Sequence, residues 1–234
     1  MNKKTILDVD VKGRRVLMRV DFNVPIKDGV VKDNTRITAA LPSIRHVLDH
    51  GGALVLMSHL GRPKGKGYEA EFSLKPVAAR LQELLGKSVI FGEDCAGAAT
   101  LARAQAMKPG EVMLVENTRF YKEEEGKAKL PDTATDEEKK AAKAEMKQKQ
   151  SDLAKKLAQL GDGEIYCNDA FGSAHRAHAS TAVVCKFYKQ NVAGFLMEKE
   201  IDYLGRALAS PEWPFVRSSA APRCRTRSTS SPTS

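Results

Sequence analysis

The sequence has few of the features that hold small secreted proteins together. Its 234 residues include four cysteines without CxxC spacing (Cys95, Cys167, Cys185 and Cys224) and no N-x-[ST] sequence. This pattern predicts neither a disulfide framework nor a zinc site. No apolar run approaches the roughly 18 residues of a membrane-spanning helix, and the start MNKKTILDVD lacks the apolar stretch of a secretory signal. We therefore expect a cytoplasmic protein without a membrane partner.

Acidic residues are too few to balance the basic ones, and the formal net charge is +9. The last 18 residues hold four arginines and no acidic residue, so residues 1–216 carry +5. A nucleic-acid role for this tail rests on composition alone, because the tail has no aromatic side chain to stack on bases. We expect no nucleic-acid partner, and the remaining charge is ordinary for a protein with a small anionic ligand.

The hydrophobic content of 42% is enough for a sizeable core. Short apolar runs alternate with helical patterns, which predicts βαβ units: an α/β, three-layer, Rossmann-like domain with a mostly parallel sheet. The expected strands are residues 15–20, 53–57, 89–91, 111–115, 164–167 and 182–187 (AVVCKF). The expected helices are residues 38–50, a helix capped by Ser73 and ended by Gly86, residues 96–106, and residues 197–208.

A stretch rich in lysine and glutamate, Lys122 to Lys156, separates two of these strands. Thr135 and Glu138 fit the capping-box pattern that begins a long helix. We interpret the stretch as a solvated helix or hairpin on the surface rather than as a binding element.

Chemically active side chains follow four of the predicted strands. In open parallel sheets, ligands bind outside the carboxyl ends of the strands. The segments found there are Asp21-Phe22-Asn23, residues 58–63 (SHLGRP), residues 116–120 (ENTRF) and residues 168–176 (NDAFGSAHR). With Arg36, this edge collects four guanidinium groups, Arg36, Arg62, Arg119 and Arg176, together with His59. Such forked donors suit phosphate and carboxylate oxygens.

Each of these residues also has a less specific interpretation. A single arginine is usually half of a surface ion pair, and Asp21 and Asn23 suit a turn before Pro25. His59 and His175 fit ordinary core positions. Gly86-Lys87-Ser88 imitates the end of a phosphate-binding loop but lacks its first glycine and follows a helix. His175 and His178 have no partner cluster, so we expect no metal site.

Five segments, RVDFNVP, RITAALPSI, LMSHLGRPKG, LVENTRFYKEEE and CNDAFGSAHRAHAS, make the chain resemble the phosphoglycerate kinases from about residue 1 to residue 216. The resemblance implies two Rossmann-like domains that close about a hinge, with the glycerate in the N-terminal domain and Mg-ATP or Mg-ADP in the C-terminal domain. It implies transfer of a phosphoryl group from 1,3-bisphosphoglycerate to ADP, giving 3-phosphoglycerate and ATP, in glycolysis or carbon fixation. It also implies a monomer.

Carried over residue by residue, the resemblance makes Asp21 and Asn23 contacts to the hydroxyl and carboxylate end of the glycerate. His59, Arg62, Arg119 and Arg176 would hold its carboxylate and phosphate. Arg36 would be the catalytic cation beside the transferred phosphoryl group, where it offsets charge in the transition state.

The family pattern ends after Val216. The family continues there with AILGGAKVSDKI or a close variant, whereas this chain reads RSSAAPRCRTRSTSSPTS. Codons chosen for this tail can be regrouped, after one added G, to encode AILGGAKVSDKIDVLSNL, so we expect a one-base frame slip near Val216. The predicted organisation is an N-terminal domain over residues 1–190, an interdomain helix and the start of a second domain over 191–216, and a disordered tail over 217–234.

The expected function is therefore that of a phosphoglycerate kinase chain that keeps only glycerate binding and lacks the residues for Mg-nucleotide. The alternative is a non-enzymatic anion-binding module.

Overall fold

A six-stranded parallel sheet forms the centre of the protein. The computed structural model describes residues 4–128, 130, 131, 133 and 135–209, with side chains to residue 206. The strand order is β5-β6-β4-β1-β7-β8, and each pair of neighbours is parallel. The strands are β1 (Arg15–Arg19), β4 (Ala53–Met57), β5 (Val89–Gly92), β6 (Val112–Val115), β7 (Ile165–Asn168) and β8 (Gln190–Ala193). A small antiparallel pair, β2 (Ile26–Lys27) and β3 (Val30–Val31), lies outside this sheet.

The central strands are apolar on both faces because helices cover both faces. On β1, Val16 and Met18 belong to one buried cluster, whereas Leu17 between them belongs to the other. Leu17 pairs in register with Val55 on one side and Tyr166 on the other. A near-continuous apolar run is typical of a strand buried in this way.

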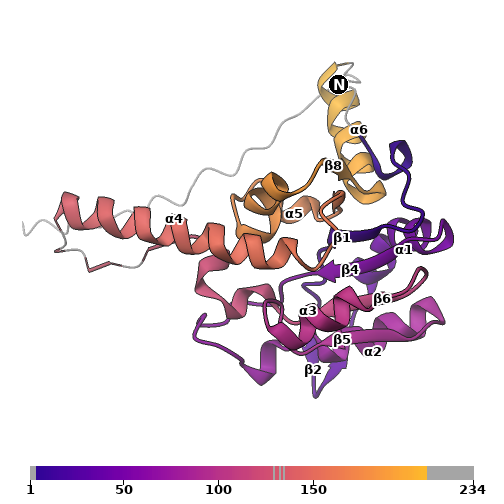
Figure 1. Ribbon diagram of the computed structural model, residues 1–234, viewed down its shortest axis with the longest axis horizontal. Coiled ribbons are helices and arrows are strands. Elements are labelled where there is room, and N and C mark those ends of the chain that lie inside the picture. The colour runs from indigo at the N-terminus through magenta and orange to yellow at the C-terminus, as the bar shows by residue number, and fades with distance from the viewer. Residues whose placement is uncertain (1–3, 129, 132, 134, 210–234) are drawn as a thin grey trace, which may run out of the picture.

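The helices divide between the two faces (Figure 1). The first buried cluster includes residues of α1 (Thr35–Asp49) and α2 (Lys75–Leu85), and Phe195 of α6 (Phe195–Ala209) packs against it. The second includes residues of α3 (Ala98–Gln105) and the C-terminal half of α4 (Asp136–Ala158). The three-layer parallel α/β architecture expected from the sequence is confirmed.

The long helix α4 begins with the predicted capping box. Thr135 accepts a hydrogen bond from the backbone N–H of Glu138 at 3.2 Å, and the Glu138 carboxylate accepts from the backbone N–H of Thr135 at 2.8 Å. The N-terminal part of α4 is mostly exposed and reaches away from the sheet, whereas Leu153 and Leu157 are buried against it (Figure 1). A surface helix within this charged stretch is therefore confirmed. The start of the stretch differs from the prediction, because Lys122–Glu124 is a 3-10 turn in which Glu124 is fully buried, and Glu125 and Lys127 line a cavity.

One predicted strand is wrong. The run AVVCKF forms a π-helical turn, Ala179–Val183, followed by a 3-10 turn, Val184–Phe187, and the edge strand is β8. An apolar run of six residues is compatible with a strand or with a buried helical turn, and Val184 is buried in the same apolar cluster as Leu157 of α4 and Tyr166 of β7. Because β8 is an edge strand, it needs few apolar residues, and only Val192 in it is buried.

Other element ends differ from the predictions by a few residues. Leu74 rather than Ser73 is the N-cap residue of α2, although the Ser73 hydroxyl accepts a hydrogen bond from the Lys75 N–H at 3.2 Å. Helix α1 begins three residues earlier than predicted and α6 two residues earlier. The predicted tail, 217–234, lies outside the described residues. The predicted division between residues 190 and 191 falls inside β8, which pairs with β7 in the central sheet. In the described part of the chain, no helix has the length and apolarity to cross a bilayer.

Candidate functional site

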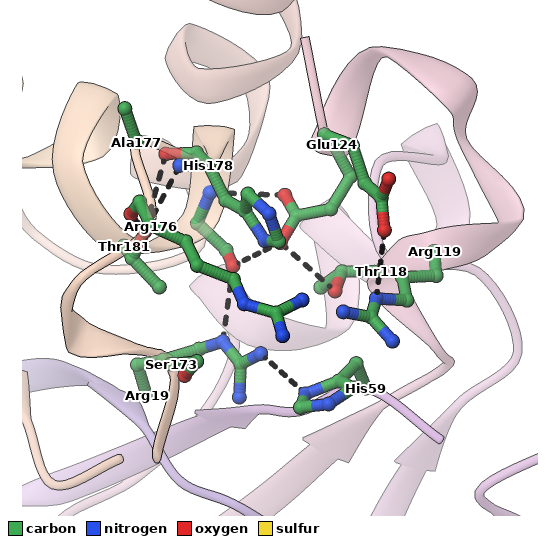
Figure 2. Close-up of polar contacts among 12 residues, drawn as sticks. Arg19, His59, Thr118, Arg119, Glu124, Ser173, Arg176, Ala177, His178 and Thr181 are labelled. Atoms are coloured by element: carbon green, nitrogen blue, oxygen red, sulfur yellow. Dashed lines mark hydrogen bonds and ion pairs between the residues drawn. The ribbon is translucent and has the colours of Figure 1, made fainter. Parts of the chain in front are cut away.

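The strand order brings the segments that follow four strands to one edge of the sheet. Strand β1 lies between β4 and β7, and β6 adjoins β4. A cavity of about 600 Å³ lies at this edge and is lined by Arg62, Arg119, Glu125, Lys127, Arg176, Ala177 and His178. A larger open cavity of about 1210 Å³ adjoins it and shares four of these residues. Figure 2 shows the side chains of Arg119 and Arg176 pointing toward one another. The expected concentration of guanidinium groups therefore exists for three of the four arginines.

Arg119 is the most buried of these three arginines, with 9% of its surface exposed. It lies in a 3-10 turn, Thr118–Phe120, whose preceding residue, Asn117, accepts a hydrogen bond from the Arg119 backbone N–H at 3.1 Å. Its Nη1 donates to the carbonyl of Gly61 at 2.7 Å. Its Nε lies 3.5 Å from the Glu125 carboxylate and has no hydrogen-bond partner among the described residues. Burial lowers the pKa of this guanidinium, and the positive charge of Arg176 adds to the effect.

Arg176 and Arg62 complete the cationic wall from two other segments. Arg176 follows α5 (Phe171–Ala174), and its carbonyl accepts a hydrogen bond from the Thr181 hydroxyl at 2.7 Å. Arg62 is exposed and follows Gly61, which has a φ of 59°. A Cβ at Gly61 would lie 2.5 Å from the Phe72 ring, so glycine is required both by the backbone and by the space.

His59 is buried beside the arginines and is neutral. Burial, together with the positive charges of Arg19 and Arg119, lowers its pKa to about 2. Its Nδ1 lies 2.8 Å from Nη2 of Arg19, and because a guanidinium can only donate, this ring nitrogen is the acceptor. The remaining Nε2–H can donate one hydrogen bond. His59 lines neither cavity, so its contact with a ligand stays a prediction, and it brings no charge to this region.

Arg36, Asp21 and Asn23 lie at the same edge but do not line either cavity. Arg36 is half-exposed and forms a 2.5 Å ion pair with Asp21. Asp21 lies beside α5, because a Cβ on Gly172 would be 3.1 Å from its carboxylate. The Asn23 amide oxygen accepts from the Gly61 N–H at 2.9 Å, and Asp21 accepts from the Asn23 N–H at 3.2 Å. Asp21 thus makes the local side-chain bond of a turn-forming residue, whereas Asn23 joins two distant segments, and the binding roles of both residues stay predictions.

Three residues of this region were missed by the sequence reasoning. Arg19 is fully buried at the end of β1, Glu124 is fully buried in the 3-10 turn Lys122–Glu124, and His178 is 4% exposed on the cavity wall. A signal existed for Arg19, since a charged residue interrupts the otherwise apolar run VLMRV. No comparable signal distinguishes Glu124 from its neighbours Glu123 and Glu125. Within the described residues, no group of three or more potential metal-ligating side chains occurs.

These features define a class: a Rossmann-like α/β domain with a cationic cavity at the carboxyl edge of its sheet. The family model described as phosphoglycerate kinase matches residues 6–218. The chain belongs to the phosphoglycerate kinase family.

Individual relatives agree with this family and show how much of it the chain covers. The phosphoglycerate kinase of Chloroherpeton thalassium is 54% identical over 216 residues, which are 92% of this chain and 48% of that protein. That of Dictyoglomus turgidum is 52% identical over 219 residues, again 48% of its length. The solved phosphoglycerate kinases of Coxiella burnetii and Pyrococcus horikoshii match with TM-scores of 0.71 and 0.73 at 34% and 32% identity. The two matches include 91% and 90% of the residues of this chain, but only 47% of the residues of each solved chain. The chain therefore spans about half the length of these relatives.

Proposed function

We propose that this chain supplies the glycerate-binding half of a phosphoglycerate kinase and binds 3-phosphoglycerate and 1,3-bisphosphoglycerate. The observation that carries the proposal is the cavity at the carboxyl edge, where Arg62, Arg119 and Arg176 converge in a member of this family. Forked guanidinium donors match the planar carboxylate and the phosphate oxygens of such a ligand. The buried Nε of Arg119, which lacks a hydrogen-bond partner among the described residues, is a further donor for a ligand oxygen.

The family's reaction transfers a phosphoryl group between 1,3-bisphosphoglycerate and ADP, and it depends on positioning and charge neutralisation. In our proposal, Arg36 is the cation that faces the transferred group, since its half-exposed side chain can leave Asp21 for a ligand at modest cost. The Mg-nucleotide would be held by the part of the relatives that this chain does not match. The described residues offer no metal-ligating cluster for it, so we assign this chain no step that involves the nucleotide.

A second candidate is a non-enzymatic module that binds small anions and performs no phosphoryl transfer. It rests on the cationic cavity alone, which fits small anions in general. Both candidates predict the same ligand at the same cavity. A monomeric state and a cytoplasmic location are part of the proposal in either case.

Calorimetric titration of the 234-residue chain with 3-phosphoglycerate tests the proposed binding. We expect Arg176→Ala to weaken binding by at least about tenfold, because it removes charge-assisted hydrogen bonds to the ligand. Arg80→Ala is the matched control, since Arg80 is a partly exposed arginine on α2 that pairs only with Glu83 among the described residues. Equal affinities for the wild type and Arg176→Ala, or no binding by a folded wild-type chain, would contradict the proposal.

A further inference from the structure

A buried carboxylate lies directly behind the cationic cavity. Glu124 has no exposed surface and lines neither cavity. One oxygen, Oε2, accepts from the backbone N–H of Ser180 at 3.0 Å, and the other, Oε1, accepts from the hydroxyls of Ser180 and Thr118. These contacts connect the turn after β6 with the turn that follows Arg176 (Figure 2). A charged group without solvent is retained at a high desolvation cost, which its partners must offset.

Ser180 connects this carboxylate to a buried guanidinium. Its hydroxyl donates to Glu124 and accepts from Nε of Arg19 at 3.0 Å, and its surface is fully buried. Arg19 also donates to the Val20 carbonyl and to His59. No described carboxylate forms a direct ion pair with Arg19, so Glu124 balances its charge through one intervening hydroxyl.

The same carboxylate faces a residue of the cavity wall. Nδ1 of His178 lies 3.8 Å from Oε1 of Glu124, and His178 lines the cavity beside Arg119 and Arg176. Burial lowers the pKa of His178, and the positive charges of Arg119 and Arg19 lower it further. The negative charges of Glu124 and Glu125 act in the opposite direction and raise this pKa. Glu124 therefore contacts His178 directly. Through Ser180 it also reaches Arg19, which in turn hydrogen-bonds to His59.

We propose that Glu124 is a positioning residue of the anion site: it holds Ser180, Arg19 and His178 in the arrangement that the ligand requires, without contacting the ligand. The inference rests on the proposed function, because it concerns the same cavity. The proposal predicts the direction in which the loss of Glu124 changes the affinity for the ligand. If Glu124 acted only through its charge, its removal would strengthen binding of an anion by reducing repulsion. If it positions the other groups, its removal weakens binding.

The test compares Glu124→Gln with Glu123→Gln in the full chain, with affinity for 3-phosphoglycerate measured by calorimetry. Both variants lose one negative charge from the same turn, but among the described residues only Glu124 hydrogen-bonds to Ser180. We expect Glu124→Gln to weaken binding by about tenfold, the effect of one lost charge-assisted hydrogen bond. Glu123→Gln should bind within about twofold of the wild type or more tightly. Glu124→Gln binding as tightly as Glu123→Gln would overturn the proposal.

A second variant and a ligand-independent measurement keep the outcome decisive. Ser180→Ala retains both buried charges and removes only the hydroxyl between them, so it decides the matter if Glu124→Gln does not fold. Nuclear magnetic resonance of the free protein should show a slowly exchanging Nε–H of Arg19 that Glu124→Gln and Ser180→Ala lose. It should also show a lower pKa for His178 in Glu124→Gln.

If the wild type binds no 3-phosphoglycerate, the proposed function fails, and these spectra still decide the positioning role. Unchanged Arg19 and His178 signals in a folded Glu124→Gln protein would overturn that role.

Discussion

His59 illustrates at the residue scale how a basic site can contain an uncharged histidine. Two guanidinium groups, those of Arg19 and Arg119, act on a ring that is 8% exposed. Proton uptake would place a third cation in the same buried region. The protonated ring therefore has a higher free energy there than the neutral ring. His59 therefore contributes a fixed hydrogen-bond donor over the whole physiological pH range.

The neutrality of His59 predicts an acid-dependent loss of stability. Its pKa is about 2 in the folded chain and is ordinarily 6.5, so the unfolded chain takes up the proton first. The contribution of neutral His59 to the free energy of unfolding is fully present above pH 6.5. It is lost as the pH falls from 6.5 toward 2, because protons then stabilise the unfolded chain. Between pH 7 and pH 5 this loss is at most about 2 kcal/mol.

Urea unfolding of the wild type and of His59→Asn at pH 7 and pH 5 measures this contribution. The variant should lose less stability than the wild type on acidification, because it cannot take up that proton when it unfolds. Parallel losses in the two proteins would show that His59 is not the group responsible.

At the scale of elements, the beginning of α6 is anchored to the carboxyl end of the sheet. Oδ1 of Asp169, directly after β7, accepts from the N–H groups of Leu196 and Met197 at 2.9 and 3.1 Å. Ser43 of α1 accepts from the N–H of Phe195 at 2.9 Å. Three of the first N–H groups of α6, which have no partner within a helix, are thus satisfied by two buried side chains. The close approach of Asp169 requires glycine at position 194.

Gly194→Ala should therefore destabilise the protein by about 1–3 kcal/mol. The added Cβ would lie 2.3 Å from Cγ of Asp169, so either α6 or the carboxylate must move. Gly205→Ala, within α6, is the control, because a Cβ there meets nothing within 4 Å and alanine favours a helix by about 1 kcal/mol. Thermal unfolding of both variants measures the difference, and equal stability would show that α6 can shift without cost.

At the scale of the whole molecule, the family's reaction needs two substrates and this chain matches about half of its relatives. The cavity described above accounts for one substrate in our proposal. We therefore expect the purified chain to bind 3-phosphoglycerate but to show no measurable ATP formation from 1,3-bisphosphoglycerate and Mg-ADP. The phosphoglycerate kinase of Chloroherpeton thalassium, assayed in parallel, is the positive control. Robust ATP formation by the 234-residue chain would contradict this expectation.

The sequence by itself determined the fold class and the cationic edge of the sheet. Apolar runs such as ALVLM and the capping box at Thr135 depend on neighbouring residues alone, so they are readable in one dimension. In a parallel sheet all carboxyl ends share one edge, which made the grouping of Arg62, Arg119 and Arg176 predictable. Element ends were less predictable because α6 begins where Asp169 and Ser43, distant in sequence, accept its N–H groups.

Only the tertiary structure decided which charges are buried and which groups balance them. Arg19 and Ser180 are 161 residues apart in the chain, and Glu124 is 56 residues from Ser180. Nothing local distinguishes Glu124 from its acidic neighbours, or shows that His59 is neutral. The run AVVCKF is as apolar as a strand, but it forms two helical turns because its side chains pack in the same buried cluster as those of α4. The more polar β8 forms the edge strand of the sheet instead. Burial, and with it the charge state of a side chain, depends on segments that meet only after the chain has folded.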